Sequence, residues 1–239
     1  MIELGIAIDG GKDSLSMAAQ AAGETVKAPG NLVISAYVTC PDISKTVTPD
    51  LKLGDDGVLL HVDLAKGKHR LGGSALAHIF DQIGDVCPDL DDVSDLKRFF
   101  NAVQVLVAEN LVSAGHDISD GAIVVSLLEM AFAGNCGMKV NLSSKSAGIF
   151  EVLFAEELGL VLEVNRANLD VIAKKLNDSG VLFEVIGKVT SSPSIEVSVN
   201  GTLYLNGKSY RRDLWEETSF SLENSHMTIT MQLATLVIL

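Results

Sequence analysis

The segment Ser194–Ser209 limits the possible folds more than any other part of the sequence, because it carries the signature of a β-hairpin. Apolar and polar residues alternate on both sides of Asn200-Gly201. Asn and Gly accept the positive φ angles that a two-residue hairpin turn requires, so this pair predicts an antiparallel strand on each side of the turn. The rest of the chain must supply elements that fit beside these strands.

Strand-like and helix-like segments follow one another in mixed order before this hairpin. Apolar and β-branched runs predict three strands, and apolar residues at helical spacing predict four helices. The strands are expected at Gly57–Leu64, Leu158–Val164 and Phe183–Val189, and the helices at Ser74–Ile83, Val93–Asn110, Ala122–Ala133 (with Gly134 as its C-cap) and Leu169–Ser179. This order predicts an α+β, or mixed α/β, fold.

The first fifty residues have a different character. Leu4–Ile8 and Leu32–Val38 predict two short strands, and Ser14–Ala22 predicts a short helix or turn. These strands look like members of a sheet whose other strands are missing. We therefore expect residues 1–50 to be the trailing part of one α/β subdomain, residues 51–223 to form an α+β subdomain, and residues 224–239 to be an unrelated tail.

Composition argues against several classes of function. The 239-residue chain has a formal net charge of −13, which disfavours nucleic acid and means that anionic ligands need backbone donors or metal ions. Its three cysteines have no CxxC spacing, which indicates neither a disulfide framework nor a zinc site and favours a reducing compartment. The sequence shows no signal peptide, and no apolar run reaches the roughly 20 residues of a membrane helix.

The turn Gly10–Ser14 invites comparison with a P-loop, whose backbone amides and lysine hold phosphate groups. Its spacing departs from that motif, because Gly11 is an additional glycine and Asp13 stands where the magnesium-binding hydroxyl should be. A carboxylate there would repel phosphate unless a metal ion lies between them. The alternative is an ordinary tight turn that uses glycine for a positive φ.

The second candidate site is His116–Gly121, directly before the expected helix Ala122–Ala133. Its carboxylates attract magnesium, which accepts nucleotide phosphates, and the amides at the helix start favour anions. The alternative is that Ser119 or Asp120 merely caps the helix, with Gly121 relieving the turn. A nucleophilic Ser-His-Asp triad is disfavoured, because three residues of one turn do not easily adopt the relayed geometry.

The third candidate, Leu64–Leu76, combines a basic cluster with Gly72-Gly73-Ser74 at the start of an expected helix. Such a loop could hold an anion, although Gly-Gly-Ser alone is a weak signal. His61 and His78 fall within an expected strand and helix and are interpreted as core or surface histidines. The basic cluster consists of Lys66, Lys68, His69 and Arg70.

Six blocks of the sequence, taken in order, resemble one protein family. They are GKDSLSM (Gly11–Met17), LVISAYV (Leu32–Val38), LGGSAL (Leu71–Leu76), HDISDG (His116–Gly121), EMAFAG (Glu129–Gly134) and FAEELG (Phe154–Gly159). From about Leu4 to Glu223 the chain resembles the second half of the synthase region of the large-type phosphoribosylformylglycinamidine synthases, within the aminoimidazole ribonucleotide synthetase superfamily. The resemblance implies the C-terminal subdomain of that fold plus the end of the preceding α/β subdomain.

The resemblance also implies a part of an ATP-dependent carbon–nitrogen ligase of de novo purine biosynthesis. In that family ATP activates the amide of formylglycinamide ribonucleotide, and ammonia from glutamine then gives the amidine, while magnesium supports ATP or ADP. The other synthase half and the glutaminase domain are not in this sequence. The chain is therefore expected to be a fragment that is inactive alone and holds no catalytic residue.

Matched by position, Asp117 corresponds to a magnesium-binding aspartate of the family and Ser119 to a nucleotide-binding serine, in a site that is structural in this half of the synthase. Lys12, Asp13 and Ser14 match the family's Gly-Lys-Asp-Ser turn, which the resemblance places at the cofactor. Two alternatives stay open: a non-catalytic packing module that binds nucleotide and magnesium, and an independent P-loop hydrolase. The expected compartment is the cytoplasm, or an organelle if the parent protein carries a transit peptide.

Overall fold

The computed structural model describes residues 1–14, 16–28, 30–84, 86–208 and 211–238. The chain divides into two units, Met1–Ser44 and Lys45–Leu239. Among the described residues, no helix combines the length and the apolar character that a membrane crossing requires.

The first unit contains one small sheet. Strand β1 (Ala18–Ala21) pairs antiparallel with β2 (Glu24–Lys27). The turn between them has positive φ at Ala22 and Gly23. Its other described residues form no helix or strand until the short 3-10 helix η1 (Ile43–Lys45), which begins at the end of this unit.

Three sequence predictions for this unit are wrong. The segment Ser14–Ala22 holds strand β1 rather than a helix, and Leu15 within it lies outside the described residues. Leu4–Ile8 and Leu32–Val38 form no strand, and the side chain of Tyr37 is 95% exposed. A strand exists only where a neighbouring strand pairs with it, and among the described residues no strand pairs with either segment.

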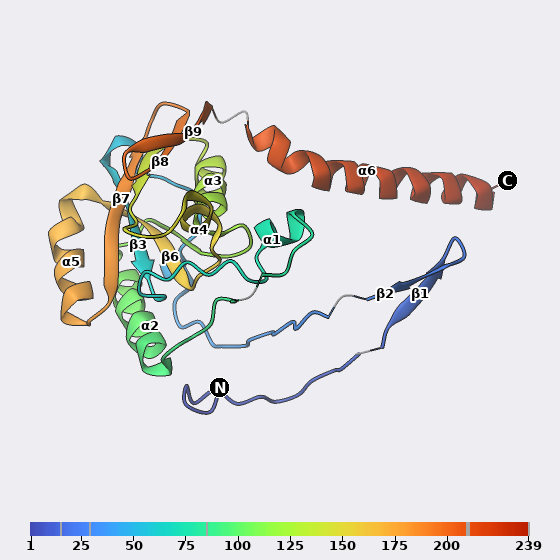
Figure 1. Ribbon diagram of the computed structural model, residues 1–239, viewed down its shortest axis with the longest axis horizontal. Coiled ribbons are helices and arrows are strands. Elements are labelled where there is room, and N and C mark those ends of the chain that lie inside the picture. Colours follow the sequence, from blue (N-terminus) through green and yellow to red (C-terminus); the bar gives the residue numbers. More distant parts are fainter. Residues whose placement is uncertain (15, 29, 85, 209–210, 239) are drawn as a thin grey trace. The chain divides into compact units, whose positions relative to one another are not determined.

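The second unit is built on a seven-stranded sheet with the order β4-β6-β3-β7-β5-β8-β9 (Figure 1). All neighbouring strands run antiparallel except the pair β5 and β8, which is parallel. The predicted hairpin is confirmed as β8 and β9. The strands are β3 (Gly57–Asp63), β4 (Ala114–Asp117), β5 (Gly137–Leu142), β6 (Gly159–Asn165), β7 (Leu182–Thr190), β8 (Ser194–Val199) and β9 (Thr202–Lys208).

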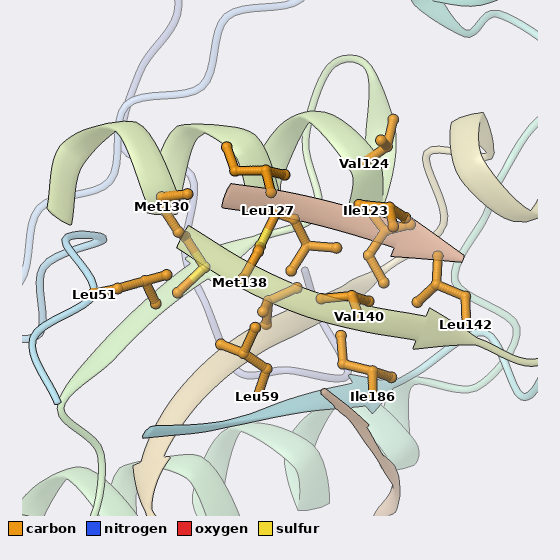
Figure 2. Packing of buried hydrophobic residues seen from close by; sticks show 14 of the residues in the cluster. Leu51, Leu59, Ile123, Val124, Leu127, Met130, Met138, Val140, Leu142 and Ile186 are labelled. Atoms are coloured by element: carbon orange, nitrogen blue, oxygen red, sulfur yellow. The ribbon is translucent and has the colours of Figure 1, made fainter. Parts of the chain in front are cut away.

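Helices cover both faces of this sheet (Figure 1). Helices α2 (Val93–Ala108) and α5 (Leu169–Asp178) pack on one face, and α3 (Ala122–Gly134) and α4 (Ile149–Phe154) pack on the other. Central strand β3 is buried on both sides, because successive side chains point to opposite faces: Leu59 joins the core under α3, and Leu60 the core under α2 and α5. Figure 2 shows Leu59 together with residues of α3 and β5.

The predicted strands and helices between Gly57 and Ser179 are confirmed within a few residues, with two differences at helix ends. Helix α1 (Ala75–Ile79) is shorter than expected. The C-cap of α3 is Asn135, in the left-handed region with φ 50°, rather than Gly134. Gly134 is still needed, because a Cβ there would come within 2.4 Å of the carbonyl oxygen of Leu51.

The remaining elements are two 3-10 helices and one long helix. They are η2 (Gly54–Asp56), η3 (Arg166–Asn168) and α6 (Arg211–Ile238). The ring of Trp215 in α6 lies 6.2 Å from that of Phe132 in α3, centroid to centroid. The side chains of the expected tail from His226 onward lie outside the described part of the chain.

Candidate functional site

The turn His116–Gly121 begins at an edge of the seven-stranded sheet. His116 and Asp117 end β4, the edge strand that pairs with β6. The amide of Ile118 donates to the carbonyl oxygen of Gly159 at 3.0 Å, which continues this pairing by one residue. The chain then reverses and enters α3, so the polar groups of the turn gather where the strand ends and the helix begins.

Asp117 presents its carboxylate to solvent. Its side chain is 75% exposed, and the imidazole of His116 lies beside it, with 3.6 Å between Oδ1 and Nδ1. His116 is itself engaged elsewhere: its Nε2 lies 3.0 Å from Oε2 of Glu129, and its Nδ1 lies 2.6 Å from the carbonyl oxygen of Asp117. The aspartate carboxylate is therefore available to an incoming ligand, while the adjacent histidine is held against α3.

Neither Ser119 nor Asp120 caps α3. The N-cap residue is Gly121, with φ 81° and no side-chain cap. Glycine is required there, because a Cβ would approach Cγ2 of Val125 to 2.5 Å. The interpretation of the turn as a simple cap by Ser119 or Asp120 is therefore wrong: the helix begins one residue later than a cap by Asp120 requires and two later than a cap by Ser119 requires.

Ala122 is buried and also has a positive φ of 62°. Its amide donates to the carbonyl oxygen of Ser119 at 2.9 Å, so the backbone closes this turn. A non-glycine residue in the left-handed region is strained. The strain lies directly beside the candidate site.

A carboxylate that sequence reasoning missed reaches this turn. Oε1 of Glu156 accepts hydrogen bonds from the amides of Gly121 and Ala75, each at 2.8 Å. The amide of Gly121 is therefore not open to an external anion. FAEELG contains Glu156, and two adjacent carboxylates after an apolar helix are the only signal in the sequence that could have drawn attention to it.

The basic loop does not form an anion site. Lys66 pairs with Asp95, and Lys68 Nζ lies 2.6 Å from Oδ2 of Asp91. Arg70 binds Glu157 through two contacts, Nε to Oε1 at 2.7 Å and Nη2 to Oε2 at 2.6 Å. The hydrogen bonds to Glu157 raise the pKa of Arg70, and that to Lys68 lowers the pKa of Asp91. The three basic side chains therefore form ion pairs with nearby carboxylates of this chain.

The glycines of this loop serve close packing. The amide of Gly72 donates to the carbonyl oxygen of Val86 at 2.8 Å, and a Cβ on Gly72 would come within 2.5 Å of that same carbonyl group. Ser74 caps the short helix α1 by accepting from the amide of Ala77. Gly72-Gly73-Ser74 is therefore explained by local structure without a ligand.

Lys12, Asp13 and Ser14 lie in the first unit, and Asp117 and Ser119 in the second. Lys12 Nζ donates to the carbonyl oxygen of Asp13 at 2.9 Å and to the hydroxyl of Ser14, so the lysine folds back on its own turn. Among the described residues, strand β1 follows this turn, whereas a P-loop opens a helix. An independent P-loop is therefore wrong for this chain.

The described residues contain no group of three or more His, Cys, Asp or Glu side chains that could hold a metal ion alone. Magnesium sites commonly use one or two carboxylates, with water and substrate phosphates completing the octahedron. The exposed carboxylate of Asp117 fits that arrangement as a single protein ligand. Asp117 does not fit a metal site in which protein side chains supply all of the ligands.

Comparison with known proteins identifies the fold. Residues 55–200 match the family described as AIR synthase related protein, C-terminal domain. The chain is 70% identical over 225 residues to the probable phosphoribosylformylglycinamidine synthase, chloroplastic/mitochondrial, of Arabidopsis thaliana, covering 93% of this chain and 16% of that protein. It is 51% identical over 228 residues to human phosphoribosylformylglycinamidine synthase, covering 93% and 17% respectively.

Solved structures agree on the fold. Thermotoga maritima PurL complexed with FGAR is similar with a TM-score of 0.59 and 18% identity, over 70% of this chain and 29% of that one. The predicted α+β fold and the resemblance read from the six sequence blocks are both confirmed. The chain spans only 16–17% of the length of the two synthases above. The chain belongs to the family of AIR synthase related proteins and contains its C-terminal domain.

Proposed function

We propose that this chain is part of a phosphoribosylformylglycinamidine synthase, which converts formylglycinamide ribonucleotide to the amidine with ATP and glutamine, and that its turn His116–Gly121 holds a magnesium-bound nucleotide. The identity of 70% over 225 residues to the Arabidopsis synthase supports the activity of the whole protein. The observation that carries the site is the 75% exposed carboxylate of Asp117 on a turn whose backbone is fixed.

Asp117 would bind the magnesium ion, and the hydroxyl of Ser119 would donate to a nucleotide phosphate. The metal supplies the positive charge that an anionic nucleotide needs on a chain of net charge −13. Related structures support the nucleotide, since Thermotoga maritima PurL was solved in complexes with ATP and with ADP. Lys12, Asp13 and Ser14 are proposed as further cofactor contacts on the family match alone.

The chemistry itself would depend on the rest of the parent protein. We assign residues 1–50 to the end of an α/β subdomain, 51–223 to the C-terminal subdomain and 224–239 to a tail, with the other synthase half and a glutaminase domain as partners. The chain alone would then convert no ribonucleotide. The proposed compartment is the cytoplasm or an organelle; the Arabidopsis relative is named as chloroplastic/mitochondrial.

A second candidate function is a packing module that binds no nucleotide. It is favoured by the hydrogen bond from the Gly121 amide to Glu156, which occupies an amide that a phosphate could have used. It is also favoured because the described residues contain no group of three or more side chains that could hold a metal ion alone.

Calorimetric titration of the 239-residue chain with ADP and magnesium separates the two functions. Asp117→Asn removes the charge at constant shape and is expected to weaken ADP binding about tenfold in magnesium, on the scale of one charge-assisted contact. Asp120→Asn is the matched control, because Asp120 is an exposed carboxylate of the same turn that caps no helix. Equal affinities of the unsubstituted chain and Asp117→Asn would remove Asp117 from the site, and no binding by either would favour the packing module.

A further inference from the structure

We propose that Glu156 is the positioning residue of the metal-binding turn: its carboxylate fixes the amide of Gly121 and thereby sets where Asp117 points. This inference rests on the proposed function of the turn. It adds a residue for which the sequence suggested no role, and which does not itself contact metal or nucleotide.

The carboxylate joins three segments that are far apart in the sequence. Glu156 follows helix α4, and its Oε1 accepts from Gly121, 35 residues earlier, and from Ala75, 81 residues earlier. Both distances are 2.8 Å, which is typical of charge-assisted hydrogen bonds. One oxygen atom therefore holds the start of α3 and the start of α1 in a fixed relation.

The contact at Gly121 acts on Asp117 through a short and otherwise fixed backbone. The Ser126 hydroxyl donates to the carbonyl oxygen of Asp117 at 3.1 Å, and the amide of Ile118 is held by β6. At the C-terminal end of the turn, Gly121 and Ala122 both have positive φ, which is strained only for Ala122. Glu156 ties this end to a segment outside the turn and α3, so its loss would leave the end held only by the hydrogen bond from the Ala122 amide to Ser119 and by α3 itself.

A carboxylate suits this position on electrostatic grounds. The first amides of a helix carry a partial positive charge and have no partner within the helix. Helix α3 has 13 residues and no side-chain cap of its own, so the Glu156 carboxylate takes the place of a cap. Because that amide is occupied, the nucleotide would depend more strongly on the metal at Asp117, and its affinity should depend on magnesium.

The test compares Glu156→Ala and Glu156→Gln in the 239-residue chain by amide exchange in NMR spectra and by titration with ADP and magnesium. In Glu156→Ala the amides of Gly121 and Ala75 should exchange at least about tenfold faster, and ADP should bind about tenfold more weakly. Glu156→Gln should stay within about threefold of the unsubstituted chain in both measurements, because its carbonyl oxygen can accept the same two bonds.

Glu157→Ala is the matched control. Glu157 is the adjacent carboxylate and is 8% exposed, but it binds Arg70 rather than the turn. Its loss should lower the melting temperature at least as much as Glu156→Ala while leaving Gly121 exchange and ADP affinity unchanged. If Glu156→Ala does not fold, Glu156→Asp, one methylene too short to reach both amides, should give the same two changes.

Two results would overturn the positioning role. The first is unchanged exchange of the Gly121 amide in Glu156→Ala or Glu156→Asp, whether or not ADP binds. The second is an equal loss of ADP affinity in Glu157→Ala, which would mean that general destabilisation is the cause. Failure of the unsubstituted chain to bind ADP would instead overturn the proposed function, while the exchange measurement would still decide the role of Glu156.

Discussion

Each of the two units contains an apolar run, but one run is exposed and the other forms a buried strand. Leu32–Val38 reads LVISAYV, and its large side chains are 70–95% exposed. Strand β3 reads GVLLHVD, and its Leu59, Leu60 and Val62 are 0% exposed. Composition does not separate these segments. The difference is that β3 has β6 and β7 as hydrogen-bonded neighbours, whereas the described part of the chain offers none to Leu32–Val38.

This contrast shows that a β-prone run becomes a strand only where partners exist. Unpaired amides and carbonyl groups gain nothing from an extended conformation, because water satisfies them equally well. Burial of apolar area adds stability only when a second layer covers the strand, as α3 and α2 cover β3. Each of the following predictions compares one position in the sheet unit with a matched position outside that core.

Removal of a core side chain should show the largest difference. Leu59→Ala should lower the free energy of unfolding by about 3 kcal/mol, through lost transfer energy and a cavity between α3 and the sheet. Leu32→Ala, at a residue that is 86% exposed, should change it by no more than about 0.5 kcal/mol. Urea unfolding followed by circular dichroism measures both. Equal losses would show that Leu32 packs as a core residue.

The second comparison is between the thiols of Cys136 and Cys40, whose rates of alkylation should differ. Burial, with a further contribution from Glu163, raises the pKa of Cys136 to about 11. At pH 8 its thiolate is then about a hundredfold rarer than that of an ordinary thiol, and only the thiolate is alkylated. Cys40 in the first unit is exposed and free. Mass spectrometry after iodoacetamide treatment should find Cys40 modified long before Cys136; simultaneous modification would contradict the half-buried position of Cys136 and its raised pKa.

The pH dependence should show the smallest effect. Burial lowers the pKa of His61, with a further lowering by His69 and an opposing effect of Asp63. The unfolded chain then binds a proton more readily than the folded one, so this contribution to stability is complete above about pH 6.5 and is lost as the pH falls below it. The slope should not exceed about 1.4 kcal/mol per pH unit.

Urea titrations at pH 5 and pH 7.5 measure this effect. His61→Gln should flatten the difference in stability between the two pH values. His78→Gln is the control, because His78 lies exposed in α1 and should leave the difference unchanged. An unaltered pH dependence in His61→Gln would assign the acid sensitivity to other groups.

Periodicity predicted most of the sheet unit because most of its segments carry a strong local signal. Val93–Asn110 and Leu169–Ser179 show one apolar face, and both are helices. Strand β4 escaped detection because it is four residues long and contains Gly115 and two polar residues. Strand β5 reads GMKVNL, in which apolar and polar residues alternate from the methionine onward and burial follows the same pattern. This alternation is a strand signal, although no strand was predicted there.

The residues of the candidate site also divide into those that a local sequence pattern reveals and those that only the fold brings together. Asp117 and Ser119 are two residues apart in the sequence, so a local motif could reveal them. Glu156 acts through a contact across 35 residues, which only the fold brings together. Glu163 is similar: it is fully buried in β6 and accepts from the amides of Lys52 and Leu53 and from the Ser113 hydroxyl. Local patterns carry no information about such contacts.

The central claim, that His116–Gly121 holds a metal-bound nucleotide, is tested most directly by titrating ADP with manganese, a paramagnetic substitute for magnesium, into the nitrogen-15-labelled 239-residue chain. Paramagnetic broadening falls off steeply with distance from the ion, so it locates the metal among the assigned amides. The account predicts that the amides of Asp117–Gly121 broaden first and that Asp117→Asn abolishes this. Broadening that begins instead at the acidic segment Asp89–Asp92, or that persists unchanged in Asp117→Asn, would contradict it.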